Sequence, residues 1–143
     1  MKVLNPYAAL AAACIVGVLA LHFPEKALAQ TPPKIEFNDV PEADCGGPVK
    51  KESLAGKVTG ATEKQRLVIF ALACNGVLYV QPEVAAPFTS LDSEGKFDAF
   101  VYLGQAYYVL LVNPGYKPDA QIASIPQKGG DIVAVFKVNG KKK

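Results

Sequence analysis

The sequence predicts an all-β protein, folded as a single antiparallel β-sandwich of about seven strands. Short apolar segments of strand-like length recur along the chain, and Gly, Pro, Asn and Asp residues separate them. After the first thirty residues, no stretch repeats its apolar residues at the helical period. An open β-barrel built from the same strands is the alternative.

Residues 1–29 have the features of a cleavable signal peptide. Lys2 precedes an apolar run over 8–21, and the segment ends in the small-x-small pattern Ala27-Leu28-Ala29. The rival interpretation is an uncleaved membrane anchor, but a helix over the apolar run would span only about 21 Å of a hydrocarbon core of about 30 Å. We therefore expect cleavage before Gln30 and export to the periplasm or the medium.

The mature chain suits one domain, because about 114 residues remain and domains commonly hold about 100–150. Residues 30–34 are expected to form an extended leader, since its two prolines cannot donate to a sheet. The sandwich is expected over 35–139, and a basic tail over 140–143.

The strands are expected between the turn signals. The expected segments are 35–37, 54–59, 66–73, 77–81, 88–91 as a short edge strand, 96–103, 106–112 and 131–138. Residues 66–73 and 106–112 are apolar on both faces, which predicts strands covered on both sides. Asn75-Gly76 is the pair that a two-residue type I′ hairpin prefers. The regular spacing is typical of an immunoglobulin-like sandwich.

Composition removes several classes of function. The one histidine, His22, lies in the signal peptide, so the mature chain has no imidazole for Ser-His-Asp or Cys-His catalysis or for a zinc site. The charge is nearly balanced and forms no basic stripe of the kind nucleic acid requires. We therefore expect no cofactor, no metal and no nucleic acid, membrane contact only through the signal peptide, and a function other than catalysis.

Cys45 and Cys74 are the two cysteines of the mature chain, and an exported pair most simply forms a disulfide. That bond would close a loop of about 30 residues and contribute roughly 3–4 kcal/mol in the chain-entropy model. Two free thiols are the alternative.

Alternation over 96–103 separates a core face from a second face that mixes rings with a carboxylate. The residues expected to face the core are Phe97, Ala99, Val101 and Leu103. The residues expected to contact a ligand are Phe100, Tyr102 and Asp98, followed by Tyr79 and Tyr116. If the second face is exposed, its rings offer a platform for a sugar or for a partner's apolar surface. Otherwise both sheet faces are covered and the rings are ordinary core and rim.

The acids Asp92, Glu94 and Asp98 are clustered, as in a calcium site or a glycoside-hydrolysing pair. The spacing does not match a calcium loop, because Gly95 comes too early. A turn with solvated charges is the simpler interpretation.

Several short motifs occur in an order shared with a known group of modules. They are Gly46-Gly47, Gly56-Lys57-Val58-Thr59-Gly60, Val80-Gln81-Pro82, Pro87-Phe88-Thr89, Gly95-Lys96-Phe97 and the stretch 110–118. With them the chain resembles an uncharacterised β-sandwich module of exported and sensor-type bacterial proteins. The resemblance implies the sandwich fold and no particular activity. That module's return strand tends to carry tryptophans, whereas here Tyr79 is the aromatic residue of the corresponding stretch.

Together these features predict an exported, non-catalytic binding module that recognises a protein partner or a cell-envelope polysaccharide. A small carboxylate-dependent enzyme acting on glycans and a purely structural envelope protein are the alternatives.

Overall fold

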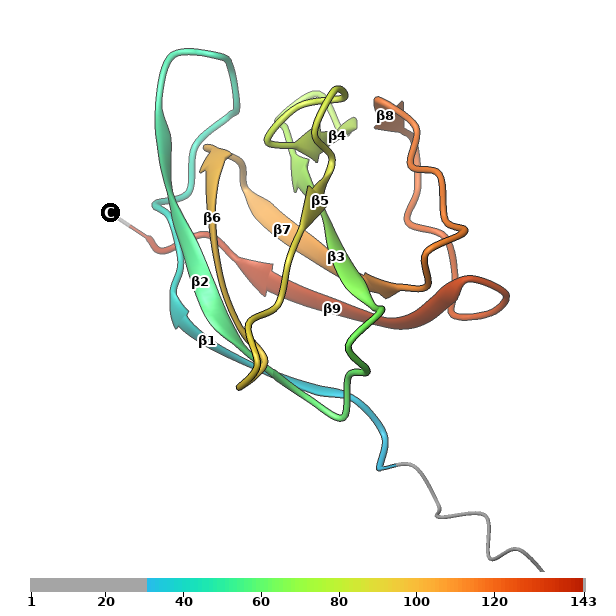
Figure 1. Ribbon diagram of the computed structural model, residues 1–143. Helices are drawn as coiled ribbons and strands as arrows, with labels where there is room; N and C mark the ends of the chain where they lie inside the picture. Colours follow the sequence, from blue (N-terminus) through green and yellow to red (C-terminus); the bar gives the residue numbers. More distant parts are fainter. Residues whose placement is uncertain (1–30, 143) are drawn as a thin grey trace, which may run out of the picture.

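The computed structural model describes residues 31–142 and shows two antiparallel sheets packed face to face (Figure 1). The smaller sheet has the order β1 (Lys34–Asp39), β2 (Lys51–Thr59) and β6 (Lys96–Tyr102). The larger sheet has the order β8 (Gln121–Ile122), β4 (Leu78–Gln81), β3 (Arg66–Leu72), β7 (Ala106–Val112) and β9 (Ile132–Asn139), with β5 (Phe88–Thr89) paired to β3. The strands form two separate sheets and not one closed sheet, so the predicted all-β sandwich is confirmed.

The predicted signal peptide, residues 1–29, lies outside the described residues, as does Gln30. Within residues 31–142, no helix has the length and apolar character needed to cross a membrane. Cleavage and export therefore stay predictions from the sequence.

The hairpin between β3 and β4 is confirmed, but the predicted two-residue turn is wrong. Leu72 pairs with Leu78, and the Ala73 amide donates to the Val77 carbonyl at 3.0 Å, which leaves a three-residue connection. Gly76 takes the left-handed conformation, with φ of 79°, as such connections require at their last position. The Asn75 side chain accepts a hydrogen bond from the Val77 amide at 3.0 Å and closes the turn.

Two further differences from the expected strands come from pairing partners that are distant in the sequence. β2 begins at Lys51 and not at Leu54, because Lys51 pairs with Tyr102 of β6. β8 lies in a stretch expected to be a loop, and its two residues pair with β4. Neither segment has a periodic pattern long enough to predict a strand by itself.

The main core lies between the two sheets. Its fully or nearly fully buried members are Leu54, Val58, Leu67, Ile69, Ala71, Phe97, Ala99, Val101, Tyr107, Val109 and Leu111. The rings of Phe37 and Phe97 meet edge to face with centroids 6.4 Å apart. Phe97, Ala99 and Val101 are core residues, which confirms the alternation expected for β6.

A second apolar cluster covers the outer face of the larger sheet. It contains the buried residues Val68, Phe70, Leu78, Val80, Leu110, Val112 and Ile132. Tyr116, Ile122 and Ile125, from the long connection between β7 and β9, pack against it. β3 and β7 are therefore buried on both faces, as their continuous apolar sequences predicted.

Candidate binding cleft

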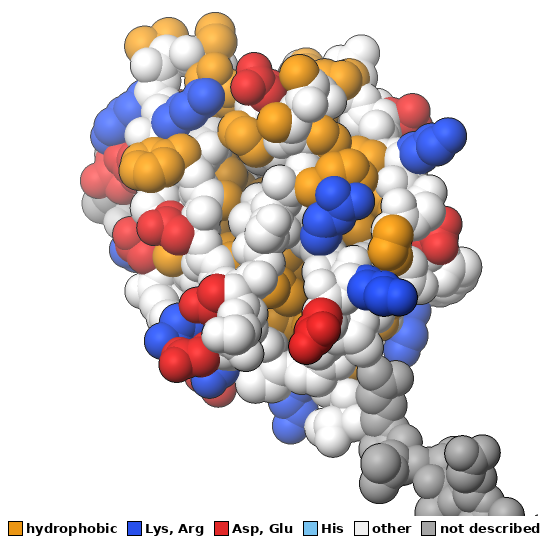
Figure 2. All heavy atoms as spheres, viewed as in Figure 1, with side chains coloured by type: hydrophobic (Ala, Val, Ile, Leu, Met, Phe, Trp, Pro, Cys, Tyr) orange, Lys and Arg blue, Asp and Glu red, His pale blue; other side chains and the backbone are white. Residues whose placement is uncertain are grey.

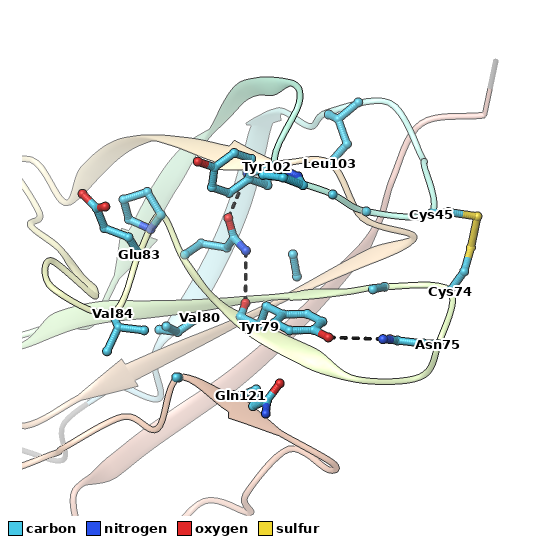
Figure 3. Close-up of a pocket in the computed structure, with 18 residues that line it drawn as sticks. Cys45, Cys74, Asn75, Tyr79, Val80, Glu83, Val84, Tyr102, Leu103 and Gln121 are labelled. Atoms are coloured by element: carbon cyan, nitrogen blue, oxygen red, sulfur yellow. Dashed lines mark hydrogen bonds between the residues drawn. A yellow bond between two sulfur atoms is a disulfide. The ribbon is translucent and has the colours of Figure 1, made fainter.

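A cleft of about 850 Å³ opens between the edges of the two sheets, near the ends of β4 and β6 (Figure 3). Figure 2 shows hydrophobic side chains gathered in the upper half of the face drawn there, with charged side chains spread around them. Residues from five segments line the cleft: 45–48, 71–75, 79–84, 102–103 and 120–121. Ligand pockets commonly enclose about 300–1,000 Å³. This hollow, which we call the tyrosine cleft, therefore has room for part of a ligand.

Gln81 joins the two sheets at the base of the tyrosine cleft. Its side chain is 2% exposed, and its Oε1 accepts a hydrogen bond from the Tyr102 amide of β6 at 2.8 Å. Its Nε2 donates to the Tyr79 carbonyl at 3.2 Å (Figure 3). A buried amide with satisfied donors and acceptors stabilises the fold, whereas an unsatisfied one would cost free energy. Gln81 therefore fixes the backbone of both cleft tyrosines relative to one another.

The first wall of the tyrosine cleft is a ring surrounded by polar side chains. Tyr79 is 38% exposed, and its hydroxyl accepts a hydrogen bond from Asn75 Nδ2 at 3.2 Å. Gln121 lies directly opposite Tyr79 in the pairing of β4 with β8. Figure 3 shows Asn75 at the hydroxyl end of the Tyr79 ring and Gln121 below the ring. An aromatic face is thus framed by two carboxamides.

The second wall is formed at the end of β6. Lys51 Nζ lies 4.5 Å from the centroid of the Tyr102 ring, within the range of a cation–π contact. The Tyr107 hydroxyl donates to the Tyr102 carbonyl at 3.4 Å and accepts from the Gly104 amide at 3.0 Å. Burial raises the pKa of Tyr107, so its hydroxyl remains protonated and able to donate at neutral pH.

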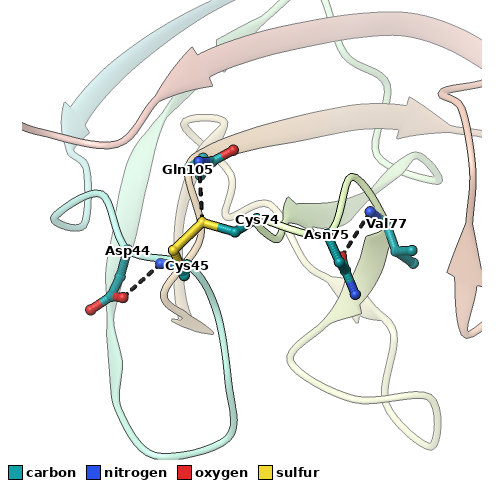
Figure 4. Close-up of a disulfide and its surroundings, with 6 residues drawn as sticks. All are labelled: Asp44, Cys45, Cys74, Asn75, Val77 and Gln105. Carbon is teal, nitrogen blue, oxygen red and sulfur yellow. Dashed lines mark hydrogen bonds between the residues drawn. A yellow bond between two sulfur atoms is a disulfide. The ribbon is translucent and has the colours of Figure 1, made fainter.

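The rim of the tyrosine cleft is held by the disulfide between Cys45 and Cys74, which confirms the predicted pair (Figure 4). The Cα atoms are 4.6 Å apart, and the Cys74 amide donates to the Cys45 carbonyl at 3.0 Å. Gln105 Nε2 donates to Cys74 Sγ at 3.2 Å. Next to the bond, Gly46 has φ of 88° and lies so close to Ala73 that an added Cβ would be 3.1 Å from its Cβ. The bond therefore fixes a loop that packs tightly on the hairpin tip.

Among residues 31–142, one charged residue lines the tyrosine cleft, Glu83. Within residues 31–142, the side chains of Glu83 and Gln121 have no hydrogen bond or ion pair to the rest of the protein. Both groups are thus available to a ligand. The remaining lining is mostly small or apolar and includes Ala71, Val80 and Leu103.

The structure brings together two of the five site residues predicted from the sequence and leaves a third nearby. Tyr79 and Tyr102 line the tyrosine cleft from opposite sheets. Phe100 is 64% exposed on the outer face of the smaller sheet, two residues before Tyr102. Asp98 lies on the same face and accepts a hydrogen bond from Ser53 Oγ.

Tyr116 lies elsewhere, on the other side of the larger sheet. Its ring packs against the second apolar cluster, and burial raises its pKa, with repulsion from Asp119 as a smaller cause. Of the residues that frame the cleft, Gln81, Glu83 and Gln121 were not predicted from the sequence as site residues. Gln81 and Glu83 are polar residues on either side of Pro82, and Gln121 lies in β8, which the sequence did not predict as a strand.

The acidic cluster at the other end of β6 forms a turn. Asp92 Oδ1 accepts hydrogen bonds from the Glu94 and Lys96 amides, both at 2.8 Å. The Lys96 amide is the main cause of a lowered pKa at Asp92, the opposite of what a general acid needs. Glu94 forms an ion pair with Lys96. Among residues 31–142, no three carboxylates or thiolates are grouped so as to hold a metal ion.

No family model, no curated protein and no solved structure matches this chain. The geometry of the tyrosine cleft is therefore the basis for the functional proposal.

Proposed function

We propose that this chain is an exported, non-catalytic binding module that holds part of a protein partner or of a cell-envelope polysaccharide in the tyrosine cleft. The observation that carries the proposal is a hollow of about 850 Å³ walled by Tyr79 and Tyr102. The Cys45–Cys74 disulfide is compatible with an oxidising compartment outside the cytoplasm, where such bonds persist.

The lining favours binding over catalysis. Aromatic rings, small apolar side chains and carboxamides provide contact area and hydrogen bonds, which are what recognition requires. Glycoside hydrolysis commonly uses two carboxyl groups, whereas Glu83 is the single carboxylate among the lining residues. Asp92 and Asp98, considered as catalytic acids from the sequence, form hydrogen bonds to a turn and to Ser53 instead.

Phe100 extends the contact surface beyond the tyrosine cleft. An exposed ring on an otherwise polar sheet face exposes apolar area to water, and such area is typical of interaction sites. Because Phe100 and Tyr102 lie on the same face of β6, a ligand longer than the cleft would reach Phe100 as it leaves Tyr102.

The test is to locate a ligand on the oxidised, exported protein by amide chemical shifts. Soluble fragments of envelope polysaccharides and short peptides would be titrated separately. We expect shifts confined to 45–48, 71–75, 79–84, 102–103 and 120–121, and we expect them to disappear in Tyr79→Ala. A Tyr116→Ala variant, changed on the opposite side, should keep them. Shifts that appear only elsewhere, or that persist in Tyr79→Ala, would overturn the proposal.

A further inference from the structure

The backbone groups next to the cleft tyrosines already have partners, although β6 and β8 are the edge strands of their sheets. The Tyr102 amide and carbonyl are already bonded to Gln81 Oε1 and to the Tyr107 hydroxyl. β4 is paired on both sides, with β3 and with β8. A peptide that binds by adding a strand needs a row of unpaired backbone groups. A peptide added as a strand would have to pair with the free edge of β6 or β8, whereas at Tyr79 and Tyr102 themselves recognition falls to side chains.

The side chains that face the tyrosine cleft combine an aromatic face with planar polar groups. Tyr79 exposes part of its ring, and Asn75 and Gln121 lie beside it (Figure 3). A sugar ring has an apolar face of C–H groups and a rim of hydroxyls that both donate and accept. Carboxamides also donate and accept, and a carboxylate accepts from two hydroxyls at once. This set of groups matches both parts of a sugar.

The charge of the lining disfavours acidic sugars at the Glu83 end of the tyrosine cleft. Among residues 31–142, Glu83 is the single charged residue of the lining and forms no ion pair, and the cation Lys51 lies against the Tyr102 ring at the second wall. A uronic acid or a phosphorylated sugar would place its negative charge beside this carboxylate. Like charges placed together in a binding site are a common means of rejecting ligands.

We infer that the tyrosine cleft binds an uncharged glycan chain, with one sugar ring stacked on Tyr79 and its hydroxyls bonded by Gln121 and Asn75, and with Glu83, at the other end of the cleft, meeting another sugar of the chain. This inference rests on the proposed function and narrows it to one class of ligand. Phe100, just outside the cleft, provides a second ring for the next part of the chain.

The experiment measures affinity for soluble hexasaccharides with the oxidised, exported protein. The uncharged probes are β-1,4-glucan, β-1,3-glucan, α-1,4-glucan and N-acetylglucosamine hexamers, and the acidic probe is a uronic acid hexamer. We expect at least one uncharged hexamer to bind and the acidic one to bind at least about tenfold more weakly. Tyr79→Ala should weaken binding about tenfold, whereas Tyr79→Phe, which keeps the ring, should stay within about threefold.

Two further variants separate recognition from folding. Glu83→Gln keeps the shape but removes the charge, and we expect the acidic hexamer to gain affinity. Gln121→Ala removes an exposed carboxamide and should weaken the uncharged hexamer a few-fold, about the effect of one hydrogen bond. Unchanged urea midpoints for both variants would show that the fold is intact.

The outcomes distinguish this inference from the proposed function. If no uncharged hexamer binds, or if the acidic one binds equally well, the glycan inference is wrong. Peptide binding that Tyr79→Ala abolishes would then leave the proposed function standing with a protein partner. If neither glycans nor peptides reach the tyrosine cleft, both proposals fail.

Discussion

The outer faces of the two sheets differ in whether the chain covers them. On the larger sheet, the connection from β7 to β9 packs over the outer face, so Val68, Phe70 and Leu110 are fully buried. On the smaller sheet, residues 31–142 leave the outer face open, and Phe100 there is 64% exposed beside Ser53 and Asp98. The strand sequences reflect this difference, because β3 is apolar on both faces whereas β6 alternates.

The comparison shows that an aromatic residue on an outer face has no fixed role. Tyr116 and Phe100 both lie outside the main core, but Tyr116 packs against the covered face and Phe100 meets solvent. A covering segment turns outer rings into a second core, whereas an uncovered ring remains available for contact. The two faces should therefore respond oppositely to matched substitutions.

The largest expected effect is on the covered face. Phe70→Ala removes a fully buried ring from the second cluster, and such substitutions typically cost about 3–5 kcal/mol. Urea denaturation of the oxidised protein would measure the change in free energy of unfolding. A loss below about 1 kcal/mol would show that the covered face is not packed as a core.

A smaller loss is expected where the two sheets are joined. Gln81→Leu keeps the approximate shape but leaves the Tyr102 amide without its partner, at a cost of about 1–3 kcal/mol. The matched control is Gln121→Leu, which changes an exposed carboxamide and should stay within about 0.5 kcal/mol. Equal effects of the two variants would contradict the joining role of Gln81.

Alkaline pH should weaken the cover of the larger sheet. Burial raises the pKa of Tyr116 above its ordinary value of 10.0, so the folded state holds the phenolic proton more tightly than the unfolded state. Its contribution to stability is complete below about pH 10 and is lost as the pH rises through the folded-state pKa. Tyr116→Phe should flatten this decline. Stability should still decline somewhat with rising pH in this variant, since burial also raises the pKa of Tyr107. Unfolding midpoints from pH 8 to 11 would show both effects.

The smallest effect on stability is expected on the open face. Phe100→Ser removes a largely exposed ring, so the free energy of unfolding should change by no more than about 0.5 kcal/mol. The same variant should weaken binding of a ligand long enough to pass from the tyrosine cleft onto β6. A stability loss comparable to that of Phe70→Ala would mean that the two outer faces do not differ as described.

The fold could be predicted because its signals are local. The apolar runs of β3 and β7, the alternation of β6 and the turn residues between strands each act within a few positions of the chain. The disulfide could be predicted from the number of cysteines, since Cys45 and Cys74 are the two that follow the predicted cleavage site. The turn between β3 and β4 was wrong in length because Asn75-Gly76 fits both a two-residue and a three-residue connection, with Gly76 left-handed in either.

The sequence by itself determined the class of fold, the disulfide and the aromatic residues that stand out. Periodicity and residue type show which faces of each strand are buried and which are exposed. Only the tertiary structure decided which of those residues meet. Tyr79 and Tyr102 share a cleft because Gln81 joins β4 to β6, and Tyr116 is separated from them by a whole sheet. The physical reason is that both features depend on contacts between residues distant in the sequence. No local pattern encodes the buried hydrogen bond between the sheets or the path of the segment that covers the larger one.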